Sequence, residues 1–128
     1  MIDVKDQEGQ VLDPQLRDLI EDKAADPGDL LVCSICSHVV TQQSQAIEVQ
    51  GAHQHRCTNP HGIEFLVDCY GQALGCDISG DRHHADSWFA GYQWRIATCS
   101  DCQQHLGWYF DCSEDFFYGL ITEKVQRA

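Results

Sequence analysis

Two cysteine pairs with the same internal spacing place the tightest constraint on how this chain of 128 residues can fold. They are Cys33-Ser-Ile-Cys36 and Cys99-Ser-Asp-Cys102. A Cys-x-x-Cys turn brings two thiolates onto one ion, and two such pairs supply the four ligands of a closed tetrahedral zinc site. The pairs lie far apart in sequence, so the ion would join the beginning of the core to its late segment. We therefore expect one structural Zn²⁺ per chain.

The eight cysteines leave two other interpretations open, a redox dithiol and a framework of disulfides in an exported domain. The amino terminus MIDVKDQEGQ is acidic and has no basic region followed by an apolar run, which is the pattern of a secretory signal. We therefore expect a cytoplasmic protein whose paired cysteines bind metal. The unpaired cysteines are expected to be buried small side chains: Cys57, Cys69, Cys76 and Cys112.

The charge balance narrows the classes of partner. Eight Lys and Arg stand against 20 Asp and Glu, and the formal net charge is -12. Such a chain repels phosphate backbones and anionic lipid surfaces, and it has no apolar run of roughly 18 residues that could span a bilayer. Nucleic-acid and membrane partners are therefore not expected.

The first 29 residues differ from the rest of the chain. They hold nine acidic and three basic residues. Asp13 and Pro14 fit the start of a short amphipathic helix that Pro27-Gly28 would end, and its apolar stripe comprises Leu16, Leu19 and Ile20. We expect an acidic leader over residues 1–29 and one zinc-binding ligand domain over residues 30–128.

From Leu30 onward the chain indicates β structure. Between Ile63 and Cys69, apolar residues alternate with Glu64 and Asp68, which is the pattern of a strand with one buried face. Further strands are expected at residues 46–50, 54–58, 94–98, 107–110 and 117–122, separated by turn residues. The fold class is therefore mainly β.

All three tryptophans of the chain lie around the second cysteine pair. Trp94 and Trp108 flank the Cys99–Cys102 turn, and Trp88 precedes them in the loop SWFAGY. A hairpin at that turn would bring two indoles together, and the loop could fold over them. The residues alone leave two interpretations open, core filling and a three-walled aromatic binding site.

Five motifs resemble the ligand-binding domain of the cereblon family, the thalidomide-binding or CULT domain. In chain order they are NPHG at 59–62, SWFAGYQW at 87–94, Cys99-x-x-Cys102, HLGWYF at 105–110 and FYGL at 117–120. The resemblance covers about residues 31–121. It implies a β-tent fold, in which two antiparallel sheets meet at an angle and are pinned by a zinc site of four cysteines, here Cys33, Cys36, Cys99 and Cys102.

The resemblance also implies a ligand. The family binds cyclic imides such as glutarimide, and uridine-like molecules that share the imide edge. By motif position the cage would be Trp88, Trp94 and Trp108, with Phe110 as its floor and Asn59 at its rim. Backbone groups near Asp86, Ser87 and Trp88 would bond the imide edge. A cyclic imide at the end of a damaged protein is a further candidate ligand, and no catalysis is expected.

Three departures from the family pattern affect this expectation. Asp86 stands where some members carry histidine, so an acidic group borders the site. Ala90 replaces a proline often found in this loop and leaves the loop less rigid. The resemblance also covers the ligand-binding domain alone and does not extend to the protease-like amino-terminal domain or the adaptor-binding helices of full-length cereblon, so no degradation machinery is inferred.

Two alternative functions stay open. Three tryptophans beside Asp86 would suit a methylated ammonium group, as in a methyl-ammonium reader. The segment Arg56-Cys57-Thr58-Asn59 resembles the active-site segment of B-type methionine sulfoxide reductases, in which Cys57 would act as a thiolate nucleophile. The match is imperfect, because in this chain the cysteine follows the arginine directly.

Overall fold

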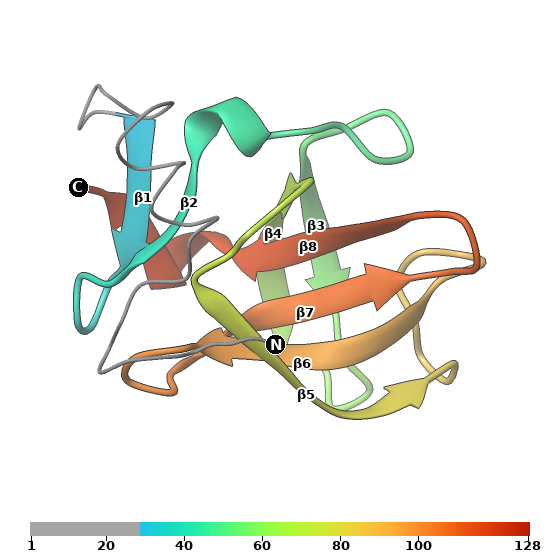
Figure 1. Cartoon of the computed structure of the whole chain (residues 1–128). Helices are drawn as coiled ribbons and strands as arrows, with labels where there is room; N and C mark the ends of the chain where they lie inside the picture. Colours follow the sequence, from blue (N-terminus) through green and yellow to red (C-terminus); the bar gives the residue numbers. More distant parts are fainter. Residues whose placement is uncertain (1–28) are drawn as a thin grey trace.

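Nine strands form two antiparallel sheets in residues 29–128, which are the residues that the computed structural model describes (Figure 1). The smaller sheet has the order β2-β1-β9, and the larger has the order β3-β4-β8-β7-β6-β5. The strands are β1 (Leu30–Cys33), β2 (Val39–Gln42), β3 (Gln54–Thr58), β4 (Glu64–Tyr70), β5 (Cys76–His83), β6 (Gln93–Cys99), β7 (His105–Asp111), β8 (Phe116–Ile121) and β9 (Val125–Arg127). Two 3-10 turns, η3 (Gln43–Gln45) and η4 (Thr122–Lys124), follow β2 and β8.

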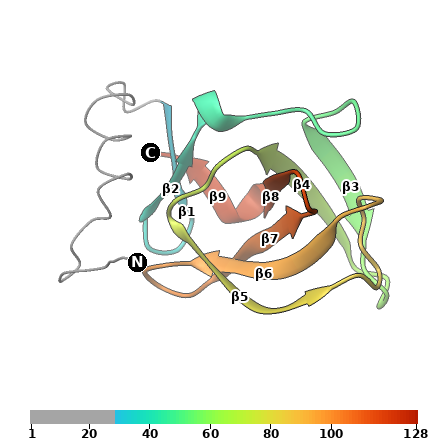
Figure 2. The same cartoon turned by 45° about the vertical axis from the view of Figure 1, so that its right-hand side comes forward.

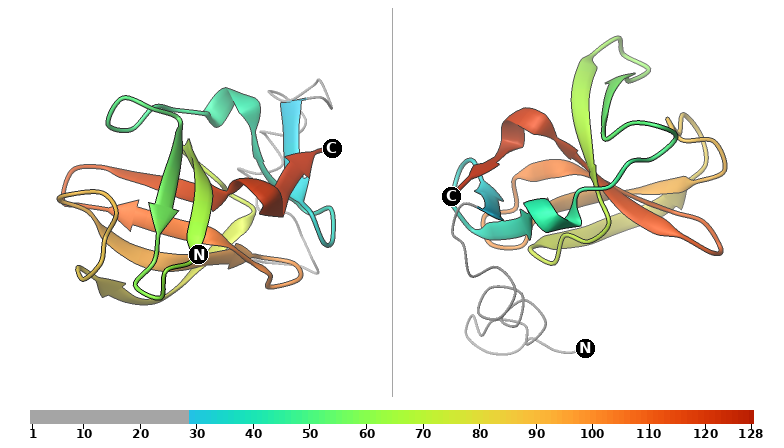
Figure 3. Two further views of the ribbon diagram at one scale, coloured as in Figure 1. Left: turned by 180° about the vertical axis from the view of Figure 1, so that it is seen from behind. Right: turned by 90° about the horizontal axis from the view of Figure 1, so that it is seen from above.

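The small sheet lies at one end of the large sheet, as the view from above shows (Figure 3). Strands β3 and β5 form the two opposite edges of the large sheet (Figure 2). The predicted mainly β architecture of two antiparallel sheets is therefore confirmed. The helix predicted from Asp13 lies outside the described residues. Within those residues, none of the helical segments has the length and apolar character that crossing a membrane requires.

The segment 46–50 is not a strand, contrary to the prediction. Ala46 forms only an isolated bridge with Tyr70. Two histidine side chains hydrogen-bond to backbone carbonyls of this segment. His53 Nδ1 lies 3.0 Å from the Ile47 oxygen, and His55 Nε2 lies 2.9 Å from the Val49 oxygen. The N–H groups of Ile47 and Val49 bond the carbonyls of Cys69 and Ala52, so the segment forms isolated bridges and no continuous ladder of strand hydrogen bonds.

The alternation predicted for β4 is wrong at its two ends. Ile63 precedes the strand and is 55% exposed. Asp68 is buried, where it accepts hydrogen bonds of 2.9 Å from Gln54 Nε2 and 2.9 Å from Thr122 Oγ1. The sequence pattern does not predict the burial of Asp68, because both hydrogen-bond donors come from other segments of the chain.

The buried side chains form two clusters. One lies where the two sheets meet and includes Leu31, Cys33, Val40, Tyr70, Cys99, Leu106, Tyr118 and Leu120. The other lies between the large sheet and the SWFAGY loop, whose Phe89 packs on the sheet. It includes Cys57, Val67, Cys69, Phe89, Trp108, Phe110, Phe117 and Ile121. The first cluster surrounds the cysteine pairs, and the second supports the tryptophans.

Gly107 lets β7 and β8 approach closely. A methyl group at this position would collide with the carbonyl oxygen of Gly119 and would lie 2.9 Å from Cα of Leu120. We expect Gly107→Ala to lower the free energy of unfolding by about 1–3 kcal/mol, because backbone cannot move aside as a flexible side chain can. Urea unfolding followed by circular dichroism measures the change.

Gly71→Ala is the matched control, because its methyl group would make only ordinary contacts of 3.6 Å. Equal stability of the two variants would contradict the packing argument.

Candidate functional site

Three tryptophans line one cavity of about 270 Å³ on the large sheet. The β6–β7 hairpin supplies four of its side chains, and the loops that follow β5 and β3 supply the others. The lining comprises Asn59, Pro60, Asp86, Trp88, Trp94, Ile96, Trp108 and Phe110. Six of the seven predicted ligand-binding residues therefore lie together, and Ser87 is the exception.

Strand register puts the hairpin residues on one face. Trp94 pairs with Phe110, and Ile96 pairs with Trp108. Because residues two apart on a strand share a face, all four side chains point to the same side of the sheet. Trp94 and Trp108 are therefore diagonal neighbours and do not stand directly opposite each other. Phe110 is 1% exposed and Trp108 is 8% exposed, so these two form the floor.

Trp88 forms a wall from the SWFAGY loop. Its Nε1 donates a 2.9 Å hydrogen bond to the Thr58 carbonyl, and its ring packs edge to face on Trp108 with centroids 4.7 Å apart. Phe89, fully buried against Phe110 and Phe117, anchors the loop. The loop thus folds over the hairpin as predicted.

Ser87 turns inward to its own loop. Its Oγ donates to the Phe89 carbonyl at 3.1 Å and accepts from the Phe89 N–H at 3.3 Å. This local pattern competes with any ligand for the hydroxyl. Ser87 therefore shapes the loop and does not line the cavity.

Trp94 forms the other wall. Its Nε1 donates a 2.8 Å hydrogen bond to the Ala85 carbonyl, and the ring of His83 stacks on it at 4.5 Å with a 30° interplanar angle. Both wall indoles therefore have their N–H groups bonded to backbone, which fixes the orientation of their rings. Sequence reasoning missed His83 as a support, because its stacking depends on the pairing of β5 with β6.

The rim is polar. Asn59 Oδ1 accepts hydrogen bonds of 2.9 Å from both the His61 and the Ile63 N–H, which closes the turn after β3. Asp86 is exposed and has a left-handed backbone with φ of 61°. Sequence reasoning missed Pro60 and Ile96 as lining residues. Ile96 could have been found from its spacing of two residues from Trp94.

The four predicted metal-ligating cysteines come together. Their sulfur atoms all lie within 4.8 Å of one another, with Cys33 and Cys102 at 3.6 Å and Cys36 and Cys99 at 3.5 Å. These separations are far longer than the roughly 2.05 Å of a disulfide, and all eight cysteines of the chain are free. Four thiols at these distances could hold one metal ion.

Two similar turns carry these cysteines. In the first, the Ser37 N–H bonds the Cys33 carbonyl at 2.9 Å, and in the second the Gln103 N–H bonds the Cys99 carbonyl at 2.9 Å. Ser37 and Gln103 both have a left-handed backbone. The first turn joins β1 to β2 in the small sheet, and the second joins β6 to β7 in the large sheet. The cysteine cluster therefore links the two sheets.

The four cysteines of the cluster differ in how readily they ionise: the pKa of Cys33 is lowered, whereas burial and neighbouring cysteine thiols raise the pKa of Cys36 and burial raises that of Cys99. Burial opposes the ionisation of Cys33, but N–H groups of Cys36 and Ile35 and the neighbouring Cys102 thiol outweigh burial and lower the pKa of Cys33 to about 7. Thiolates are the form that binds metal.

Cys57 has a different environment. It does not line the cavity, and burial raises the pKa of its thiol. Arg56 is exposed on the other face of β3, where its guanidinium bonds Glu64 at 3.1 Å. The arginine is therefore not directed at the thiol that it would have to activate.

The comparisons with known proteins agree with this geometry. No protein-family model matches the chain. Cereblon from Drosophila pseudoobscura pseudoobscura is 32% identical over 108 residues, which cover 76% of this chain and 17% of that protein. Cereblon from Gallus gallus is 39% identical over 73 residues, covering 52% of this chain and 16% of that protein. The chain thus matches only about a sixth of the length of these curated relatives. These matches show that the chain contains a cereblon-like domain.

Proposed function

We propose that this chain is a non-catalytic binding module for cyclic imides and uridine-like molecules, and that the tryptophan-lined cavity is the site. The observation that carries the proposal is the convergence of Trp88, Trp94 and Trp108 on one cavity with a buried aromatic floor. Pockets for small molecules are mostly apolar, with a few placed polar groups. A flat neutral ring can bury its faces against fixed indoles there.

Two backbone groups support the recognition of an imide edge. The carbonyl of Asp86 and the N–H of Trp88 make no hydrogen bond within residues 29–128, and both residues line the cavity. An imide offers an N–H between two carbonyls, so one acceptor and one donor at this edge would satisfy it. These contacts use the backbone and do not depend on the side chain at position 86.

Asn59 supports contact with a second part of the ligand. Its Oδ1 is already bonded to the turn, which leaves the Nδ2 donor unpaired among the described residues. That donor can bond a carbonyl that projects past the rim. Candidate natural ligands are a free cyclic imide or uridine-like metabolite, and a cyclic imide at the end of a damaged protein, since these share the imide edge.

We propose zinc as the metal of the cysteine cluster. Tetrahedral thiolates at a Zn–S distance of about 2.3 Å stand about 3.8 Å apart, close to the 3.5 and 3.6 Å separations of the two nearest sulfur pairs. Four thiolates suit zinc and leave no open coordination position, so the ion would be structural.

A parallel titration tests the proposed function. Glutarimide, uridine, trimethyl-lysine and methionine sulfoxide are added to the zinc-loaded protein, with tryptophan fluorescence and calorimetry as readouts. We expect saturable binding of glutarimide and uridine, because both carry an imide that can reach the wall indoles. Failure of both to bind would overturn the proposal.

The other two ligands test the alternatives. Saturable binding of trimethyl-lysine without glutarimide binding would identify a methyl-ammonium reader. Reduction of methionine sulfoxide that disappears in Cys57→Ala would identify an enzyme.

A further inference from the structure

One residue with a charged side chain lies among the residues that line the tryptophan cavity. Asp86 is the one ionisable residue among the lining residues in the described part of the chain, and the others are aromatic, aliphatic or amide side chains. The Asp86 carboxylate forms neither a hydrogen bond nor an ion pair with any residue from 29 to 128. The cavity therefore presents one uncompensated negative charge at its exposed rim.

Hydrogen bonds and ring stacking of the flanking residues hold the loop that carries Asp86 in place. The preceding carbonyl, that of Ala85, accepts the indole N–H of Trp94, and His83 stacks on the same indole. The Ser87 N–H bonds the His84 carbonyl at 3.4 Å and tightens the turn. Asp is one of the few residues that readily adopt the left-handed backbone found at position 86.

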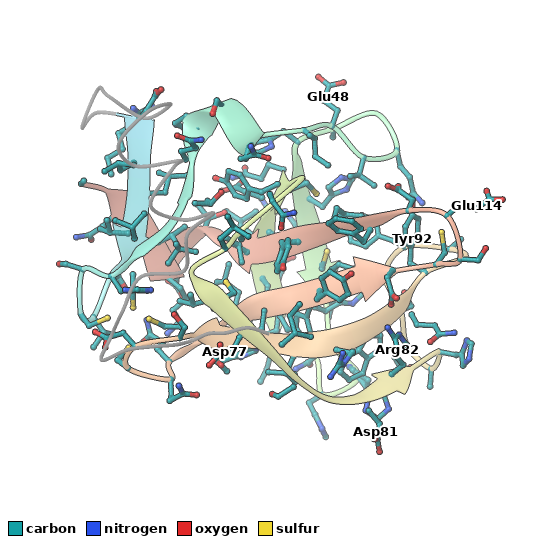
Figure 4. All side chains as sticks on the ribbon, viewed as in Figure 1. Glu48, Asp77, Asp81, Arg82, Tyr92 and Glu114 are labelled. Atoms are coloured by element: carbon teal, nitrogen blue, oxygen red, sulfur yellow. The ribbon has the colours of Figure 1, made fainter. Side chains whose placement is uncertain are left out.

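The neighbouring cations are engaged elsewhere. The Nε–H of Arg82, on β5, donates a 3.1 Å hydrogen bond to Asp111 (Figure 4). The Nε–H of Arg95, on β6, donates a 2.9 Å hydrogen bond to the Gly80 carbonyl. Neither arginine lines the cavity. The positive charges of this part of the sheet therefore do not neutralise Asp86.

Two electrostatic effects then act in the same direction. A carboxylate attracts positive charge, and the faces of aromatic rings carry a negative quadrupole that also attracts cations. The net charge of -12 adds a long-range repulsion of anions. Each contribution is modest at an exposed rim, but none opposes the others.

We propose that Asp86 makes this cavity select cyclic imides that carry a positive charge beside the ring over neutral or anionic ones. This inference rests on the proposed function, because the imide ring is what holds the charged group at the rim. Asp86 acts as a specificity-determining residue through its carboxylate, while its backbone carbonyl is available to the imide edge.

The test uses two probes of the same shape. One is glutarimide bearing a trimethylammonium group on a short linker from ring carbon 3, and the other is its uncharged tert-butyl isostere. Calorimetry in low salt is expected to show about fivefold tighter binding of the cationic probe to the wild-type protein. In Asp86→Asn, which keeps the left-handed backbone and the side-chain shape, we expect this ratio to fall to about twofold or less, since the local carboxylate is lost and only the aromatic attraction and the weak long-range field of the other acidic residues remain.

Glu48→Gln is the matched charge control. It removes one negative charge from an exposed residue that does not line the cavity and that lies at the outer edge of the molecule in Figure 4. The ratio should stay at its wild-type value there, and it should shrink in 0.5 M salt for the wild type. Equal binding of the two probes, or a ratio unchanged in Asp86→Asn, would overturn the inference.

Unsubstituted glutarimide separates this failure from failure of the proposed function. If glutarimide binds and the ratio is one, only the charge selection is wrong. If neither glutarimide nor either probe binds, the imide site and the inference that rests on it are both wrong.

Discussion

Replacement of Cys99 by serine is expected to release the metal and unfold the domain. Cys99 is completely buried and stands at the end of β6, and its sulfur lies 3.5 Å from that of Cys36 in the turn between β1 and β2. Structural zinc contributes an apparent binding free energy of about 10–16 kcal/mol in small finger peptides at pH 7, which is as large as the stability of a typical domain. Loss of one of the four proposed zinc ligands is therefore expected to remove enough free energy to abolish folding.

The measurements are metal content by elemental mass spectrometry and urea unfolding by circular dichroism. Cys112→Ser is the matched control, because that cysteine is free and lies outside the cluster. It should keep one zinc per chain and change the unfolding midpoint little. Treatment of the wild type with a strong chelator should reproduce the effect of Cys99→Ser, and added zinc should reverse it.

A folded Cys99→Ser protein with the wild-type unfolding midpoint would contradict the structural role of the metal. A wild-type protein that binds no zinc, and that a reducing agent destabilises, would instead favour the disulfide interpretation. Thiols whose sulfur atoms lie 3.5 and 3.6 Å apart can form disulfides when they are oxidised. Disulfide bonds are therefore the chemical alternative to metal binding at this cluster.

The cysteine cluster could be predicted because its chemistry is local. Each Cys-x-x-Cys turn fixes two ligands within four residues, so only the meeting of two turns had to be inferred. The backbone that shapes those turns was not predictable from the pattern, since Ser37 and Gln103 adopt left-handed conformations without being glycine. The second turn also predicted a hairpin at this place, and in the structure Trp94 and Trp108 lie on the same face of that β6–β7 hairpin.

What the sequence could not reveal depends on contacts between distant segments. Asp68 reads as a solvent-facing residue until Thr122, 54 residues later, donates a hydrogen bond to it. Segment 46–50 reads as a strand until His53 and His55 fold back onto its carbonyls. Strand β5 has an irregular register with β6 and mostly exposed residues, so no alternating pattern marks it. In each case tertiary contacts outweigh the local pattern.

Replacement of Trp94 by alanine is expected to reduce glutarimide affinity strongly while leaving the fold intact. Central aromatic anchors typically contribute about 2–4 kcal/mol to binding, which corresponds to a loss of about 30- to 1,000-fold. Trp94 is only half-buried, whereas Trp108 is 8% exposed and packs on Phe65, Trp88 and His105. Trp108→Ala would therefore lose stability as well as affinity, and Trp94→Ala gives the cleaner result.

Calorimetry is the appropriate readout, because the substitution removes one of the fluorescent reporters. Phe116→Ala is the matched control, since it deletes an aromatic ring that is 41% exposed and does not line the cavity. Its glutarimide affinity should equal that of the wild type. If Trp94→Ala bound glutarimide within about twofold of the wild type while remaining folded, the indole would be a structural side chain. The ligand would then have to bind outside the wall that Trp94 forms with the Ala85 carbonyl, and the imide site would have to be sought elsewhere on the sheet.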